Sequence, residues 1–280
     1  MQYKLLKLIG FISIIGLTSC EKIDLRGAFF SYQTVNERFE ESMEWNEENP
    51  FKEIKTTNEA YSFFVMADSH IGGIENFQTF TKNAISSKAL ALVMVGDITT
   101  GRIKDYETLS QNIPHEDSIT SFLMVGNHDI YFDGWKEFYK RFGSSTYYFW
   151  VKTPKAKDLF ICLDSGSGTL GDKQLQWLKD LLQEKRNLYR HCIVFTHVNF
   201  FRTRHTGSTN PVVDELQTLM DLFYTYNVNF VIMGHDHIKS IENLEKTTYI
   251  TLDAILDGFS QASYLKLSID DFVENEFVNL

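Results

Sequence analysis

Five short stretches of the sequence combine carboxylates, an amide and imidazoles, most of them next to glycine. They are Asp68-Ser69-His70, Gly96-Asp97, Gly126-Asn127-His128-Asp129, His197 and Gly234-His235-Asp236-His237. Each stretch directly follows an apolar run typical of a buried β-strand. A single Asp or His at a strand end is commonly a turn former or a satisfied polar group, but that reading does not explain the whole set.

The donor types in these stretches define the kind of metal ion that they could bind. Carboxylate and amide oxygens together with imidazole nitrogens, without thiolate, form a hard-to-borderline ligand set. Such a set suits Mn, Fe, Zn or Mg rather than a structural zinc site built on cysteines. Gly96, Gly126 and Gly234 are expected to let the backbone turn tightly, so that the next side chain faces the ions.

The segments between these stretches alternate in a way that indicates an α/β fold. Short apolar runs, expected as strands buried on both faces, alternate with amphipathic segments expected as helices. The carboxyl ends of such strands meet at one edge, where ligands bind in open α/β sheets. Two sheets are favoured over one. The expected strands are 62–67, 90–95, 121–125, 147–151, 157–164, 192–196, 230–233, 248–252 and 264–268, and the expected helices are 77–88, 135–142, 172–186 and 212–226.

In this order the five stretches resemble the motifs of the calcineurin-like metallophosphoesterase family. The resemblance covers all five motifs and roughly residues 61–268. It implies an α/β fold built as a four-layer α/β/β/α sandwich of two mixed sheets flanked by helices. It also implies a pair of divalent or trivalent metal ions whose identity, Mn, Fe, Zn or Mg, stays open. The implied ligands are Asp68, His70 and His237 for one ion and Asn127, His197 and His235 for the other, with Asp97 bridging them.

By the same resemblance the activity is hydrolysis of a phosphoester by an attacking metal-bound hydroxide. The ions would also orient the phosphoryl oxygens and neutralise charge in the displacement. His128 is expected beside the ions without binding them, where it could protonate the leaving group or stabilise the transition state. Asp129 is expected to orient a histidine. Asp236 is interpreted as part of a turn, without a catalytic role.

A small phosphorylated molecule is the expected substrate. Arg202, Arg204 and His205 follow His197 in a loop and are candidates for contacting it. Diesters are favoured over monoesters, because few cationic side chains are available for a terminal dianion and because residues 164–178 weakly resemble cyclic-nucleotide phosphodiesterases and purple acid phosphatases. The alternatives are a phosphomonoesterase of the same fold and a non-catalytic metal-binding surface lipoprotein. The formal net charge of −10 argues against nucleic-acid packaging.

The first residues have the organisation of an export signal. Two lysines precede an apolar run at 8–17 that is too short to span a bilayer comfortably. Leu17-Thr18-Ser19-Cys20 resembles the lipobox of bacterial lipoproteins, in which the cysteine is lipidated and becomes the new N-terminus. Residues 1–19 are therefore predicted to be a lipoprotein signal peptide. Cys20 is predicted to anchor the exported protein in a bacterial membrane, on a periplasmic or surface face, with an ordinary secretory signal as the alternative.

The rest of the chain divides into an acidic segment and one large domain. Residues 20–60 are predicted to form a short helix and a tether that lifts the catalytic domain, residues 61–280, off the membrane. The length of 280 residues and the 43% apolar composition fit one well-buried domain. Cys162 and Cys192 lie in apolar, strand-like runs, so buried free thiols are preferred over a disulfide. The oligomeric state is left open.

Overall fold

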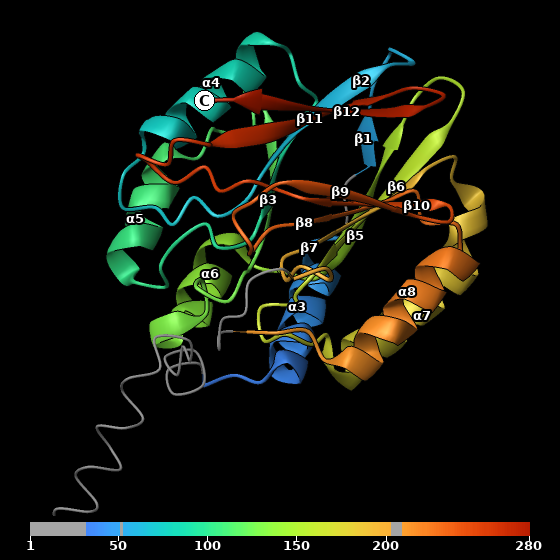
Figure 1. The fold of residues 1–280 in the computed structure, drawn as a ribbon, viewed down its shortest axis with the longest axis horizontal. Helices are drawn as coiled ribbons and strands as arrows, with labels where there is room; N and C mark the ends of the chain where they lie inside the picture. The colour runs from blue at the N-terminus through green and yellow to red at the C-terminus, as the bar shows by residue number, and fades with distance from the viewer. Residues whose placement is uncertain (1–31, 51–52, 203–208) are drawn as a thin grey trace, which may run out of the picture.

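The computed structural model describes residues 32–50, 53–202 and 209–280, which form two sheets packed face to face (Figure 1). Both sheets contain parallel and antiparallel neighbours. In spatial order the seven-stranded sheet contains β1 (Glu53–Lys55), β5 (Tyr147–Lys152), β6 (Lys157–Leu163), β7 (Cys192–Thr196), β8 (Phe230–Met233), β10 (Thr247–Thr251) and β9 (Ser240–Leu244). The five-stranded sheet contains β12 (Val273–Asn279), β11 (Ser263–Ile269), β2 (Tyr61–Met66), β3 (Ala91–Val95) and β4 (Thr120–Met124).

The central strands are buried on both faces, which explains their continuous apolar sequences. Alternate side chains of a strand point to opposite faces. In β2, Phe63 and Val65 therefore face the other sheet, whereas Phe64 and Met66 face the helices. Phe63 packs on Phe160 of the opposite sheet, with ring centroids 4.7 Å apart. The core between the sheets thus fixes the two sets of strand ends relative to each other.

Helices cover the outer face of each sheet (Figure 1). In the five-stranded half, Phe77, Phe80 and Ala84 are buried at helical spacing along one face of the first helix. The helices of this half are α4 (Glu75–Ser86), α5 (Ile103–Asn112) and α6 (Gly134–Phe142). Those of the other half are α7 (Gly171–Lys185) and α8 (Val213–Thr225), and short 3₁₀ turns occur at Tyr131–Asp133 and Arg186–Leu188. The predicted α/β/β/α sandwich is confirmed.

The acidic segment before the domain differs from its prediction as a tether. Its described part contains α3 (Val35–Glu48), and β1 adds a parallel strand beside β5. Arg38 of α3 is completely buried, and Trp45 packs edge-on against Tyr139 with ring centroids 5.9 Å apart. The acidic cluster has specific partners, since Glu41 accepts a hydrogen bond from the indole of Trp135. The predicted short helix is present, but these residues pack on the domain instead of forming a free tether.

Two further predictions concern the N-terminus and the cysteines. The predicted signal peptide at 1–19 and the predicted lipid anchor Cys20 lie outside the described residues. Among the helices that the structure describes, none has the length and apolar character needed to cross a membrane. Cys162 and Cys192 are buried free thiols, as predicted. Burial raises the pKa of both, that of Cys192 to about 12, so neither thiol is a reactive nucleophile.

Candidate metal centre

The five sequence stretches meet where strands of both sheets end. β2, β3 and β4 contribute from one sheet, and β7 and β8 contribute from the other. The His, Asp and Glu donor atoms form three overlapping groups, and within each group all donor atoms lie within 4.8 Å of one another. The groups are Asp68, His70 and His237; His70, Asp97 and His128; and Asp97, His197 and His235. The sandwich thus brings together residues separated by up to 169 positions, from 68 to 237.

Tight backbone turns hold these side chains. Non-glycine residues rarely adopt positive φ, and each such residue costs of the order of 1–3 kcal/mol. Hydrogen bonds between neighbouring turns maintain the conformation: the amide of His70 donates to the carbonyl of Asp97 at 3.0 Å, and the amide of His235 donates to Asp68 Oδ2 at 2.8 Å. The residues with positive φ are Asp68 (55°), His70 (40°), Asp97 (49°), His235 (75°) and His237 (60°).

The motif glycines act differently from one another. Gly96 has φ +76°, as expected of a glycine that permits a tight turn. Gly126 does not have a positive φ, but a Cβ there would lie 2.2 Å from Asp97 Oδ1 and 2.7 Å from His197 Nε2. Its role is therefore to leave space for two candidate ligands. A turn-forming role was predicted for these two glycines and for Gly234, and of the three only Gly96 has a positive φ.

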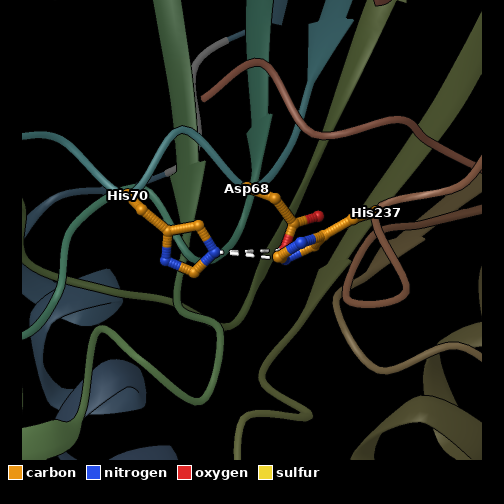
Figure 2. Close-up of side chains that lie close together, drawn as sticks. All are labelled: Asp68, His70 and His237. Atoms are coloured by element: carbon orange, nitrogen blue, oxygen red, sulfur yellow. Dashed lines mark hydrogen bonds and ion pairs between the residues drawn. The ribbon is translucent and has the colours of Figure 1, made fainter. Parts of the chain in front are cut away.

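The more open ligand group contains Asp68, His70 and His237 (Figure 2). The Nε2 atoms of the two histidines face each other at 3.2 Å, and His237 Nε2 lies 3.3 Å from Asp68 Oδ1. Burial lowers the pKa of His70 to about 4 despite the nearby Asp97 and Asp68. Burial raises the pKa of Asp68, but the neighbouring His237 and His197 outweigh it and the net shift is downward. A neutral imidazole and an ionised carboxylate are the protonation states that bind metal.

The more buried set of predicted ligands is Asn127, His197 and His235. In each of them, the side-chain polar atom that does not face the centre makes an orienting hydrogen bond. His197 Nδ1 lies 2.9 Å from the carbonyl of Val95, and His235 Nε2 lies 2.9 Å from the carbonyl of Thr209. Because a carbonyl only accepts, each of these nitrogens carries a proton, and in the neutral imidazole the opposite nitrogen has the lone pair. Asn127 Nδ2 donates to the hydroxyl of Tyr131, 3.0 Å away. This pattern is typical of metal ligands.

Three candidate ligand atoms are buried without a hydrogen-bond partner among the described residues: Asp68 Oδ1, Asn127 Oδ1 and His197 Nε2. A buried polar atom left unpaired costs about 1–3 kcal/mol, so such a cluster needs an explanation. In the neutral form of His197 with the proton on Nδ1, all three are electron-pair donors that face an acidic centre. Two of them lie 3.3 Å from a charged or titratable neighbour, Asp68 Oδ1 from His237 Nε2 and His197 Nε2 from Asp97 Oδ2. A bound cation satisfies them together, and the O/N donor set fits the metals predicted from the sequence.

The pKa shifts of Asp97 and His197 also indicate that a positive charge is favoured next to the Asp97 carboxylate. Burial raises the pKa of Asp97, but His197 and His128 outweigh it and hold the pKa well below its usual range. Burial lowers the pKa of His197, yet the charge of Asp97 outweighs it and raises that pKa to about 10. Their closest atoms, His197 Nε2 and Asp97 Oδ2, are 3.3 Å apart. Either a proton or a metal ion can supply the cation that this pair favours.

His128 lies beside this cluster on its solvent side. Its side chain is 35% exposed, and its Nε2 lies 3.9 Å from Asp97 Oδ2. The ring packs edge-on against His70, with centroids 4.6 Å apart, while its backbone amide donates to Asp97 Oδ1 at 2.7 Å. The imidazole is therefore placed next to the candidate ligands and accessible from solvent, as a proton donor to a substrate has to be.

Asp129, the other predicted catalytic residue, has a different role in the structure. Its fully buried carboxylate accepts hydrogen bonds from the amides of Ile98, Thr99 and Gly126 and from the Thr99 hydroxyl. Burial and the charge of Asp97 raise its pKa to about 7. These contacts hold the loop after β3 against the end of β4. The structure therefore contradicts the predicted histidine-orienting role and makes Asp129 a residue that positions the loop of Asp97.

The predicted substrate-binding loop is only partly described, since Arg204 and His205 lie outside the described residues. Arg202 is held by internal contacts rather than directed at a substrate. Its Nε donates to Asp236 Oδ1 at 3.2 Å, and its Nη1 donates to the carbonyl of Thr209 at 2.5 Å. Because Thr209 is also the partner of His235, Arg202 and Asp236 support a candidate ligand. Sequence reasoning missed this function of Asp236, although its position between two ligand histidines was a usable signal.

Comparison with known proteins agrees with this geometry. Residues 61–239 match the family model described as calcineurin-like phosphoesterase. The chain belongs to this family. It is therefore a hydrolase that acts on phosphoesters, and all five stretches lie within the matched residues.

Solved structures share the fold of this phosphoesterase. A dimetal phosphatase from Danio rerio is 13% identical, with a TM-score of 0.63 over 78% of this chain and 97% of that one. GAP50, described as the anchor in the inner membrane complex of Plasmodium, is also 13% identical, with a TM-score of 0.62 over 79% of this chain and 84% of that one. At such identities the likeness concerns the fold alone. No curated protein matches the chain.

Proposed function

We propose that this phosphoesterase hydrolyses a small phosphorylated substrate with two metal ions bound at the strand ends. The observation that carries the proposal is the set of buried oxygen and nitrogen atoms on Asp68, Asn127 and His197 that have no hydrogen-bond partner among the described residues and face one another. One ion would be held by Asp68, His70 and His237 and the other by Asn127, His197 and His235, with Asp97 between them. When bound, such ions supply Lewis acidity, activate water and orient the phosphoryl group. The identity of the metal is left to measurement among Mn, Fe, Zn and Mg.

The chain's own residues would supply positioning and proton transfer. Asp97 is fixed by the backbone amide of His128 and by the loop that Asp129 holds, so its carboxylate can serve both ligand groups without moving. The partly exposed imidazole of His128 would donate a proton to the departing alkoxide as the phosphorus–oxygen bond breaks. Tyr131 would keep the amide oxygen of Asn127 directed at the centre.

Within this proposal we place phosphodiesters ahead of phosphomonoesters. A monoester dianion carries more charge than a diester and needs more cationic side chains for its terminal oxygens. Arg202, one candidate for that contact, is instead tied to Asp236 and to the carbonyl of Thr209. Comparing kcat/KM for bis-nitrophenyl and mono-nitrophenyl phosphate tests the order, and a strong preference for the monoester would reverse it.

We also propose that the enzyme is exported and held at a bacterial membrane by a lipid on Cys20. The support is the sequence of the first residues, where an apolar run ends in Leu17-Thr18-Ser19-Cys20. Intact-mass analysis of the protein from membranes should show a chain beginning at a lipid-modified Cys20. An unmodified cysteine, or a mature chain that begins elsewhere, would contradict this part.

The test of the central proposal combines metal analysis with a substrate panel. The purified protein should contain nearly two metal ions per chain, lose hydrolysis on chelation, and regain it with added Mn or a similar ion. The panel should include phosphomonoesters, phosphodiesters, nucleotides and phospholipid head groups. Full activity in exhaustively metal-free protein would refute the mechanism. Metal binding without turnover of any substrate would instead favour the non-catalytic lipoprotein.

A further inference from the structure

The loop that follows β6 supports the buried half of the metal centre from behind. The hydroxyl oxygen of Ser165 accepts hydrogen bonds from the amides of His197 at 3.0 Å and Val198 at 2.9 Å. The same loop passes against the Gly126–Asn127 turn, since a Cβ at Gly166 would lie 2.8 Å from the carbonyl oxygen of Gly126. One loop therefore contacts the backbone beside two candidate ligands of the same ion.

This loop is fixed by a buried ion pair with the N-terminal helix. Arg38 of α3 donates from Nε and Nη2 to the two carboxylate oxygens of Asp164, at 2.7 and 3.0 Å. Side-chain exposure is 0% for the arginine and 1% for the aspartate. Asp164 Oδ1 also accepts from the amide of Gly166 at 3.0 Å, which sets the course of the loop toward Gly126. Removing the guanidinium would leave a buried carboxylate unpaired, and the loop would have to move to hydrate it.

We infer that Arg38, acting through Asp164 and Ser165, is a positioning residue for the ion bound by Asn127, His197 and His235. The inference rests on the proposed two-metal function and goes beyond it, because Arg38 lies outside residues 61–239 that match the family. The alternative is that the ion pair only attaches α3 to the domain. If Arg38 positions the ion, breaking the pair should change the loop and the site of that ion. If the pair only attaches α3, both should stay unchanged.

A second arginine–aspartate pair, in which the aspartate is buried and the arginine is partly buried, provides a control on the same strand. Arg190 donates from Nε and Nη2 to Asp158, at 3.0 and 2.7 Å. Asp158 is the second residue of β6 and Asp164 directly follows its last residue, so the pairs lie at opposite ends of one strand. Ser167 offers a second control. Its hydroxyl accepts a hydrogen bond from Arg38 at 3.1 Å, but within the described part of the chain the His197 amide donates to Ser165 and not to Ser167.

The experiment compares Arg38→Gln with Arg190→Gln, and Ser165→Ala with Ser167→Ala, in two measurements. Amide hydrogen exchange on metal-free protein should be about tenfold faster at His197 and Val198 in Arg38→Gln and Ser165→Ala, relative to Ile193 and Val194 of β7 in the same protein. Calorimetric titration with Mn should show one ion bound about 10–100-fold more weakly in these two variants and the other ion unchanged. The control variants should show neither change.

Several results would overturn the inference. The ion pair would only attach α3 to the domain if Arg38→Gln and Arg190→Gln behaved alike. The same conclusion would follow if both ions were weakened equally, or if exchange at His197 were unchanged in Ser165→Ala. If Arg38→Gln does not fold, Ser165→Ala still gives the decisive comparison, because it leaves the ion pair intact. If wild-type protein binds no metal, the proposed function fails, while the exchange measurement still decides whether Arg38 fixes the loop.

Discussion

The two halves of the metal centre are built with different degrees of support. In the buried half, His197 is fully buried. His197, Asn127 and His235 each make a hydrogen bond through the polar atom that does not face the centre. In the open half, the side chain of His237 is 29% exposed, and its Nε2 and that of His70 lie 3.2 Å apart. Because these two nitrogens are so close, a single proton or cation can lie between them.

For the two ions that we propose, this difference indicates different roles. A site whose ligands are already oriented binds its ion with little reorganisation, so the buried half should hold its metal more tightly. The open half contains the partly exposed His237, so we expect substrate and solvent to approach from this side. We therefore expect stepwise metal binding, with the buried half filled first.

Replacement of Asp97 should abolish the difference between the halves and have the largest effect. Its carboxylate belongs to donor groups in both halves. Asp97→Asn keeps the shape but removes the charge, so both ions should bind weakly and kcat/KM should fall at least about 1,000-fold, or about 4 kcal/mol. Metal analysis after dialysis and steady-state kinetics measure this. Loss of a single ion would mean that Asp97 serves one half only.

Single-ligand variants should separate the halves. His197→Ala should lose one ion and impair activated and unactivated substrates alike, by about 100-fold or more, because it removes a ligand and not a proton donor. His237→Ala should keep the buried ion, and its activity should be partly restored by millimolar Mn. A metal count of zero in either variant would show that the halves fill cooperatively.

His128→Ala tests proton transfer at the open side without disturbing the ligands. The backbone amide that donates to Asp97 is retained in this variant, so metal content should not change. Loss of general-acid catalysis typically costs about 100- to 10,000-fold. The loss should be near the upper end for alkyl esters and much smaller for nitrophenyl esters, whose leaving groups need little protonation. Equal losses would assign the imidazole to electrostatic stabilisation instead.

Tyr131→Phe should have the smallest effect and should be confined to the buried half. The variant removes the hydroxyl that accepts from Asn127 Nδ2 at 3.0 Å. Loss of such an orienting partner weakens metal affinity by about tenfold or somewhat more. Titration with Mn should show a weaker first ion and an unchanged second one. An unchanged first ion would mean that the surrounding packing alone orients the amide.

Much of the fold was readable because the central strands are buried on both faces. Cys192–Thr196 and Phe230–Met233 are continuous apolar runs, and the structure has strands within the same bounds. The strands β9 and β12 were missed because they are edge strands whose exposed, acidic sequences lack the apolar pattern. α5 was missed because only Tyr106 and Leu109 are buried along it, too few to give a clear period.

The site was predictable to the extent that its motifs are local in sequence. The ligand candidates stand within a few residues of strand ends, and the structure brings them together. The contacts that orient them join distant parts of the chain, such as His235 with Thr209 and Arg38 with Asp164, and no local pattern reports them. For the same reason an acidic helix that packs on the domain was indistinguishable from a solvated tether.

The position of β11 has a consequence for how the protein folds. β2, which leads into Asp68, lies between β3 and β11, and its pairing with β11 joins Val65 to Leu265. This neighbour emerges from the ribosome some 200 residues later than β2, so the five-stranded sheet cannot close until β11 has been synthesised. Pairings this distant in sequence slow folding. Until β8 and β11 have been synthesised, the nascent chain must therefore carry an open β2 edge and an incomplete metal centre, which would suit the export that we propose.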